Sequence, residues 1–294
     1  MTVKVLGNVY IVHRIASGFG ILEAPFHAAE GRLLFSDVLR GGVYSIGADG
    51  GVETVIEHRR GIGGLAAHEQ GGLIVTGRNV SWKHGLDSRV LLEADPERDV
   101  RSFNDLTVDG RGRICVGALN LDPPTPEGSP RPSHVLRIEL DGSVTVLADD
   151  VLFANGLAFS ADGKTLLLID SARRCLWAFP VDEGDGLGSR RLLASWESAT
   201  PDGLAISADG AIWVALATAQ APGLVVALEP GGRERGRLEV PAPMVTNVCF
   251  GGADLADLYV VTGHVGAGAD GGAIYKTRVG VPGLPLTPAR IAPA

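Results

Sequence analysis

The sequence predicts an all-β protein: a six-bladed β-propeller with four-stranded blades. Three observations lead to this prediction, namely a motif that recurs six times, short apolar strands joined by Asp-Gly turns, and no convincing amphipathic helix pattern. Several short strands in each repeat of roughly 40 to 50 residues are typical of a propeller blade. A β-sandwich or a barrel would account for the strands but not for a sixfold repeat.

The repeated motif is clearest in two nearly identical segments, Asn155-Gly-Leu-Ala-Phe-Ser-Ala-Asp-Gly and Asp202-Gly-Leu-Ala-Ile-Ser-Ala-Asp-Gly. Aligning weaker copies on their apolar third residue gives six motifs, which open at Glu23, Gly63, Asn104, Asn155, Asp202 and Thr246. Six blades then account for the whole chain of 294 residues, although this length alone would suggest two domains. We therefore predict a single propeller domain over residues 1–294.

Each copy has the same internal order of elements. An apolar strand leads into a turn and then into a second β-rich strand, at residues 33–37, 73–76, 114–117, 166–170, 212–215 and 258–262. Asp-Gly between apolar runs predicts hairpins, because type I′ turns need a positive φ. Residues 3–15 and 273–277 also have strand patterns. Pairing these two end segments in one blade would close the ring of blades.

Composition excludes several classes of partner. The formal net charge of −8 argues against binding to nucleic acid or to an acidic membrane surface. No apolar run approaches the roughly 18 residues of a membrane span. The three cysteines, which are far apart and form no CxxC pair, fit small core residues in a reducing compartment. The N-terminus also lacks the pattern of a signal peptide, so we expect a cytoplasmic protein. The sequence leaves the oligomeric state open.

The opening residues of the six motifs predict a metal site. A radial repeat relates them by the propeller axis, so they should lie at one height near the central channel. Four of them carry a carboxylate or a carboxamide: Glu23, Asn104, Asn155 and Asp202. Oxygen donors without His or Cys suit a hard cation such as Ca²⁺. The competing interpretation is that Asn and Asp precede Gly because these pairs form turns. It explains Asn155 and Asp202 but not the other two positions.

The chain also resembles a known family, the SMP-30/gluconolactonase/luciferin-regenerating-enzyme family. The resemblance lies in five segments that follow one another in order over almost the whole chain: Ile21-Leu-Glu-Ala-Pro-Phe, Phe103-Asn-Asp-Leu-Thr-Val-Asp, Asn155-Gly-Leu-Ala-Phe-Ser-Ala-Asp-Gly-Lys-Thr-Leu, Pro201-Asp-Gly-Leu-Ala and Phe250-Gly-Gly. It implies a six-bladed propeller with a divalent metal in its channel. It further implies Glu23, Asn155 and Asp202 as metal ligands, Asn104 as a further ligand or a substrate contact, and Asp202 as the general base.

The departures from the family pattern concern the substrate. Where the sugar-lactone members carry an Arg two residues before the Asn, this chain has Ser102, with Arg101 beside it. We expect Arg101 and Asn104 to contact the substrate, and a substrate less polar than an aldonolactone. His264 follows a strand and could shuttle protons beside them, although an ordinary loop residue is the alternative. The Pro-rich residues 121–132 predict an extended loop over the channel mouth, with a plain surface loop as the alternative.

The predicted activity is hydrolytic ring opening of a lactone or related ester by a metal-dependent hydrolase. A divalent ion polarises the carbonyl group, and Asp202 takes a proton from the attacking water. Ca²⁺ is the expected ion, with Zn²⁺, Mn²⁺ and Mg²⁺ as alternatives. No Gly-x-Ser-x-Gly elbow supports a serine hydrolase. Two other hypotheses stay open: a non-catalytic, calcium-binding scaffold, and phosphotriester hydrolysis at the same residues.

Overall fold

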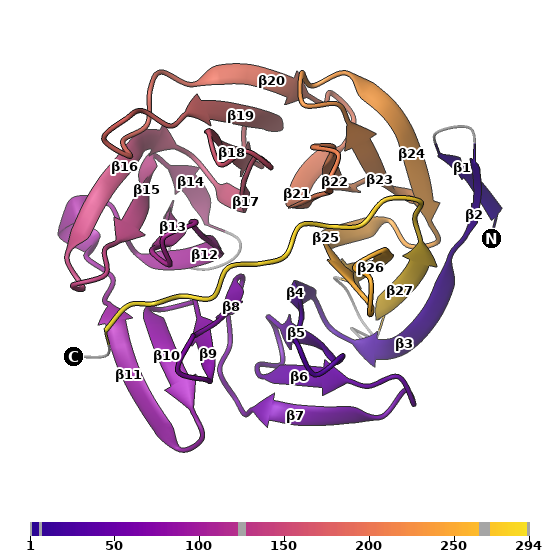
Figure 1. The fold of residues 1–294 in the computed structure, drawn as a ribbon, viewed down its shortest axis with the longest axis horizontal. Helices are drawn as coiled ribbons and strands as arrows, with labels where there is room; N and C mark the ends of the chain where they lie inside the picture. Colours follow the sequence, from indigo (N-terminus) through magenta and orange to yellow (C-terminus); the bar gives the residue numbers. More distant parts are fainter. Residues whose placement is uncertain (1, 6–7, 123–127, 265–270, 293–294) are drawn as a thin grey trace. The chain divides into compact units, whose positions relative to one another are not determined.

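The computed structural model describes residues 2–5, 8–122, 128–264 and 271–292, which form an all-β structure (Figure 1). Within these ranges the only helical segment is a short 3₁₀ turn, η1 (Pro96–Arg98). No helix in the described part of the chain is both long and apolar enough to cross a membrane. The predicted all-β class is therefore confirmed.

The chain divides into two compact units, Met1–Ile62 with Leu193–Pro285 and Gly63–Leu192 with Leu286–Ala294. Each unit contains three antiparallel sheets, and each of these sheets is built on four strands that follow one another from the inner to the outer edge. The six sheets are the blades of the predicted six-bladed β-propeller, so this fold class is confirmed as well. That the whole chain is a single domain stays a prediction.

The first unit holds three blades. They consist of β4 (Leu22–His27), β5 (Leu33–Asp37), β6 (Val43–Ile46) and β7 (Val52–Ile56); of β21 (Thr200–Ile206), β22 (Ile212–Ala217), β23 (Gly223–Leu228) and β24 (Glu234–Val240); and of β25 (Met244–Gly251), β26 (Asp257–Gly263), β27 (Gly272–Arg278) and β3 (His13–Phe19). In the last blade the outer strand comes from the N-terminal part of the chain.

The two end segments pair in part as predicted: His13 and Arg14, at the end of the predicted segment 3–15, lie opposite Lys276 and Tyr275, and β3 continues beyond that segment to Phe19. The first strands differ from the prediction. β1 (Thr2–Val5) and β2 (Asn8–Ile11) form a hairpin, and Val5 pairs with Gly236 on β24. This hairpin therefore extends the β21–β24 sheet instead of the closing blade. An added strand supplies partners to the backbone groups at the outer edge of that sheet.

The second unit holds the other three blades, except that its boundary at Leu192 falls inside the outer strand β20. They consist of β8 (Leu65–Ala67), β9 (Leu73–Val75), β10 (Val80–His84) and β11 (Asp87–Leu92); of β12 (Ser102–Val108), β13 (Ile114–Asp122), β15 (Ser133–Ile138) and β16 (Val144–Val151); and of β17 (Ala154–Phe159), β18 (Thr165–Asp170), β19 (Cys175–Pro180) and β20 (Arg191–Ser195). The Pro-rich segment adds β14 (Ser129–Arg131), which pairs with the end of β13. Residues 123–127 of the predicted loop lie outside the described residues.

The turns after the inner strands correct one detail of the prediction. In the turn Ser160–Gly163 the N–H of Gly163 donates to the Ser160 carbonyl at 2.8 Å, and Gly163 has φ +69°. Asp162 does not have a positive φ, which a type I′ turn would require. The hairpin instead uses a longer loop that ends in a left-handed Gly. The Asp162 carboxylate stabilises this loop by accepting the Lys164 N–H at 3.1 Å.

The core lies between neighbouring sheets of each unit. The second strands are almost completely buried and rich in Val, Leu and Ile, whereas outer strands such as β7 are exposed. In the first unit Trp213 packs edge-on against Phe250, with ring centroids 5.9 Å apart. The three cysteines are free and buried, as expected of small core residues. Burial raises the pKa of Cys175 to about 11, which makes this thiol unreactive.

Candidate functional site

The predicted site residues lie at or beside a β-bulge in an inner strand. The pairing between first and second strands shifts register between Glu23 and Phe26 on β4, and at the corresponding points of β12, β17 and β21. Asn104, Asn155 and Asp202 fall inside these shifts, and Glu23 is the last paired residue before one. A bulge redirects a side chain while the flanking ladder continues. The common feature of the four positions is thus a local change in strand geometry.

The turn interpretation of the Asn-Gly and Asp-Gly pairs is wrong. Asn155 lies within β17, and Asp202 and Gly203 lie within β21. At position 203 a glycine is required by a close contact and not by a turn. A Cβ atom there would lie 2.0 Å from the carboxamide of Asn247, so only a residue without a side chain fits.

The first unit brings Glu23 together with a residue that the sequence did not indicate. The Nδ2 of Asn247, on β25, donates to Oε2 of Glu23 at 3.2 Å. Both side chains are buried, with 4% and 8% relative exposure. The Oδ1 of Asn247 accepts the Val248 N–H at 2.8 Å. Asp202 lies half-buried on β21 of the same unit, next to the Gly203 that contacts Asn247.

Thr246 was the predicted ring position on β25, but its role is structural. It is fully buried, and its hydroxyl contacts the carbonyls of Leu22 and Val261. The register of β25 shifts between Val245 and Asn247, which leaves Thr246 as the one unpaired residue, whereas two residues are unpaired at the shifts of β4, β12, β17 and β21. The sequence did contain a signal for this residue, because Asn247 carries a carboxamide and directly follows Thr246, the residue aligned with the other motif openings.

The second unit brings the two predicted asparagines together. The Nδ2 of Asn104 donates to Oδ1 of Asn155 at 3.0 Å and to the Ala154 carbonyl at 2.9 Å. The Nδ2 of Asn155 donates in turn to the hydroxyl of Ser171 at 3.2 Å. These bonds fix both amides, so that the oxygen of Asn155 faces Asn104. A Cβ at Gly63 would lie 2.1 Å from Oδ1 of Asn104, which explains the glycine at the second motif.

Arg101 belongs to a separate polar network. Its Nε donates to Oδ1 of Asn120 at 3.0 Å, and the Nδ2 of Asn120 donates to Asp99 at 3.0 Å and to the Pro132 carbonyl at 3.2 Å. The backbone N–H of Arg101 pairs with Leu119. The guanidinium is thus held against β13, beside the start of β12.

His264 follows β26 in a half-buried position. The backbone N–H of His264 donates to the Gly20 carbonyl at 3.3 Å. Gly271 lies close to this side chain, because a Cβ atom placed on Gly271 would be 2.8 Å from the Cβ of His264. Among the described residues its ring forms no hydrogen bond with Glu23 or Asp202. A part in proton transfer stays a prediction.

The donor set available to a metal is made of oxygens. No three His, Cys, Asp or Glu side chains gather into a metal-binding group within residues 2–5, 8–122, 128–264 and 271–292. Two carboxylates and two carboxamides, as in the predicted set, contain only hard donors of the kind that Ca²⁺ takes. The Glu23 carboxylate is buried, and its Asn247 partner is a neutral carboxamide that adds no positive charge beside it.

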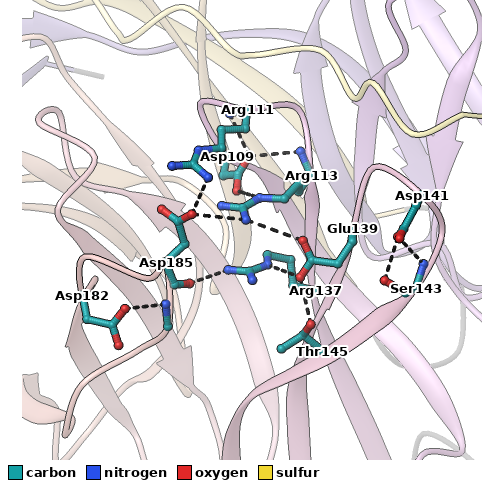
Figure 2. Close-up of polar contacts among 11 residues, drawn as sticks. Asp109, Arg111, Arg113, Arg137, Glu139, Asp141, Ser143, Thr145, Asp182 and Asp185 are labelled. Atoms are coloured by element: carbon teal, nitrogen blue, oxygen red, sulfur yellow. Dashed lines mark hydrogen bonds and ion pairs between the residues drawn. The ribbon is translucent and has the colours of Figure 1, made fainter.

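A second polar cluster lies at the far end of β12 from Asn104 (Figure 2). A pocket of about 200 Å³ is lined by three arginines, two carboxylates and an apolar wall: Arg111, Arg113, Arg137, Asp109, Asp185, Leu147, Phe159 and Leu187. A third carboxylate, Glu139, pairs with Arg113 and Arg137. Burial alone would lower the pKa of Arg113, but its hydrogen bond to Asp109 raises it. Burial would likewise raise the pKa of Glu139, which bonds from Arg137 and Thr145 lower instead. The positive charges of the three arginines are balanced by the three carboxylates, so we interpret this cluster as a set of ion pairs that stabilises the fold.

Known proteins resemble the chain over most of its length. A family model described as SMP-30/gluconolactonase/LRE-like matches residues 23–264. The chain is 30% identical to a 6-deoxy-6-sulfogluconolactonase of Pseudomonas putida, over 89% of this chain and 92% of that protein. It is 29% identical to the pentonolactonase XacC of Haloferax volcanii, over 90% and 92%. The solved structure of a luciferin-regenerating enzyme matches with a TM-score of 0.84 at 21% identity, over 96% and 99% of the two chains.

Proposed function

The chain belongs to the SMP-30/gluconolactonase/LRE-like family, and on that premise we propose that it is a divalent-metal-dependent lactonase. Two relatives with about 30% identity are named for lactone substrates, one a sulfonated gluconolactone and the other a pentonolactone. The observation that carries the proposal is the buried carboxylate of Glu23, held by a neutral carboxamide on a strand of the neighbouring blade.

We assign Glu23, Asn155 and Asp202 to the metal, with Asn104 as a further ligand. Their oxygen-only chemistry favours Ca²⁺ over softer ions. The metal would supply Lewis-acid polarisation of the lactone carbonyl, a contribution of several kcal/mol in comparable enzymes. In the second unit, the amide of Asn104 holds the oxygen of Asn155 in one orientation.

Asp202 is the proposed general base. Its carboxylate takes one proton from a water molecule while the water oxygen bonds to the carbonyl carbon of the lactone. The bond from that carbon to the ring oxygen then breaks. The ring oxygen receives the proton from Asp202 and leaves as a hydroxyl group on the same molecule, so the product is a hydroxy acid. No covalent enzyme intermediate is required.

The substrate contacts that we propose are Asn104, Arg101 and His264. The departures near Arg101 favour a lactone less polar than an aldonolactone, and a panel of lactones tests this point. We expect γ- and δ-alkyl lactones to be hydrolysed with a higher kcat/KM than gluconolactone. A clear preference for sugar lactones would contradict the expectation while leaving the lactonase proposal intact.

The proposal is tested by replacing the base. Asp202→Asn should lower kcat by about 10² to 10⁴-fold, because it removes the proton acceptor. The matched control is Asp162→Asn, which alters an exposed turn carboxylate in the repeated Ala-Asp-Gly sequence and should leave kcat unchanged. Wild-type turnover by the Asp202 variant would rule out the assigned base.

Metal dependence separates this proposal from its alternatives. We expect chelation to abolish lactone hydrolysis and Ca²⁺ to restore it, with Mn²⁺, Mg²⁺ and Zn²⁺ compared in parallel. Calcium binding without turnover of any lactone, ester or phosphotriester would favour a non-catalytic scaffold. Preferred turnover of a phosphotriester would favour the third hypothesis.

A further inference from the structure

We infer that Asn247 is a positioning residue for Glu23, and that it sets the affinity of the chain for calcium. The inference rests on the proposed function, because it assumes that Glu23 is a metal ligand. It begins from the bond between Asn247 Nδ2 and Glu23 Oε2, which joins strand β25 to strand β4 inside the first unit.

Both ends of the Asn247 carboxamide are fixed. The oxygen accepts the Val248 N–H at 2.8 Å, which leaves the NH₂ group to face the Glu23 carboxylate. A flipped amide would bring its oxygen against the carboxylate and its NH₂ group against the Val248 N–H, so both contacts would become repulsive. Asn247 therefore offers a donor, and only a donor, to Glu23.

The backbone around Asn247 is fixed as well. Thr246 is fully buried, and its hydroxyl contacts the Leu22 carbonyl, directly before Glu23. On the other side, the Asn247 carboxamide fills the space above the bare Cα of Gly203. Few rotamers are open to a side chain confined in this way. Glu23 is consequently held in one geometry before any cation arrives, so that less conformational entropy is lost on binding.

The chemistry of the partner matters for a cation site. A lysine or an arginine at this position would orient the carboxylate equally well but would cancel its charge. A carboxamide orients Glu23 without adding a positive charge beside it. Partners of this kind, which hold a ligand without touching the metal, typically change metal affinity by about 10 to 100-fold when they are removed.

The test is the dissociation constant of Ca²⁺ alone, measured by isothermal titration calorimetry on the full chain. Asn247→Leu keeps the volume and removes the donor, and we expect about 10 to 100-fold weaker binding. Asn247→Ala, which is smaller and free of any overlap with Gly203, should weaken binding in the same range. Circular dichroism before titration verifies that each variant is folded.

The matched control is Thr246→Val, which removes the neighbouring hydroxyl contact from β25 to β4 without touching Glu23. It should lower the melting temperature of the metal-free protein and weaken calcium binding much less than either Asn247 variant, because the bond to the Glu23 carboxylate is kept. If Asn247→Leu and Asn247→Ala bind calcium as the wild type does, the inference is overturned. An equal loss of affinity in Thr246→Val would also overturn it, since general loosening of β25 would then explain the effect.

Glu23→Gln separates this inference from the proposal on which it depends. If that variant binds calcium like the wild type, Glu23 is not a ligand, and the proposed metal site itself fails. If Glu23→Gln abolishes binding while both Asn247 variants retain it, only the positioning role of Asn247 is wrong.

Discussion

His27 ends strand β4 in a polar and aromatic contact with the neighbouring blade of the first unit. Its ring stacks on Tyr259 with centroids 5.8 Å apart, and its Nε2 accepts the Gly252 N–H at 3.1 Å. Burial lowers the pKa of His27, with Asp257 opposing and Lys276 adding to the effect. The folded protein therefore favours the neutral imidazole, which is the form that can accept this hydrogen bond.

This arrangement predicts a pH-dependent stability. Because the folded pKa is lower than the unfolded value of about 6.5, the folded state binds fewer protons. The contribution of His27 is then complete above about pH 6.5 and is lost as the pH falls towards the folded pKa. We expect His27→Gln to reduce the difference in free energy of unfolding between pH 7.5 and 5.5, measured with urea. His13→Gln, at an exposed position, should not, and equal pH dependence in both variants would refute the assignment.

The site residues show which part of a site a repeat can reveal. Asn104 and Asn155 were predicted from their aligned positions, and a hydrogen bond joins them in the structure. Asn247 was missed because only the opening residue of each copy was compared. On β25 the opening residue, Thr246, directs its hydroxyl to two backbone carbonyls, and the next residue, Asn247, meets Glu23. Which of two neighbouring side chains meets the next blade depends on backbone geometry, which no spacing in the sequence records.

At the level of whole elements, the arginine and carboxylate network joins two blades of the second unit (Figure 2). Asp185 lies in the β19–β20 loop and pairs with Arg111 and with Arg113 of the β12–β13 turn. Its backbone carbonyl also accepts a hydrogen bond from Arg137 on β15. One loop thus satisfies three arginines of the neighbouring blade, two of which are largely buried.

Removing the charge of Asp185 should weaken this connection. We expect Asp185→Asn to lower the free energy of unfolding by about 1 to 3 kcal/mol in low salt, because Arg113 loses a carboxylate partner in a mostly buried place. The decrease should be smaller in 1 M NaCl, where the remaining charges are screened. Asp141→Asn, in the exposed β15–β16 turn, is the control and should have a smaller effect. An effect that is independent of salt would show that packing, not charge, dominates.

Strands were predicted better than their connections. The second strand of the first motif, 33–37, coincides with β5, because an apolar run at residues 33–35 begins shortly after Gly31 and is followed by Ser36 and Asp37. The type of turn was wrong, since Asp-Gly fits both a type I′ turn and a longer loop with a left-handed Gly. The β1–β2 hairpin was also missed. Its placement on β24 depends on an outer edge that exists only in the folded blade.

For the molecule as a whole, the proposed metal makes stability depend on its concentration. A ligand that binds only the folded state stabilises it by about 2.7 kcal/mol at 100 times its dissociation constant. We expect Ca²⁺ at that concentration to raise the melting temperature and excess EDTA to reverse the change, as followed by calorimetry. Glu23→Gln should show no calcium-dependent shift. A wild-type melting temperature that ignores calcium would contradict the metal site.

The sixfold repeat predicted the number of blades, but it did not predict that the chain divides into two compact units. The two compact units take three blades each, and the C-terminal residues 286–292 belong to the second of them. There the Arg290 N–H donates to the Gly112 carbonyl, and the His68 ring contacts the Ile291 carbonyl at 3.0 Å. This segment has no counterpart in the repeat, so its partners could not be found by comparing copies.

The bulges of the inner strands have a consequence for how such proteins diversify. Asn104, Asn155 and Asp202 lie where the register shifts, so their backbones are not part of the regular pairing between the first and second strands. A substitution there changes the chemistry that the blade presents without breaking the framework that supports it. Under the proposed function, the residues that act on the substrate can therefore be exchanged one at a time while the ladder around them is kept.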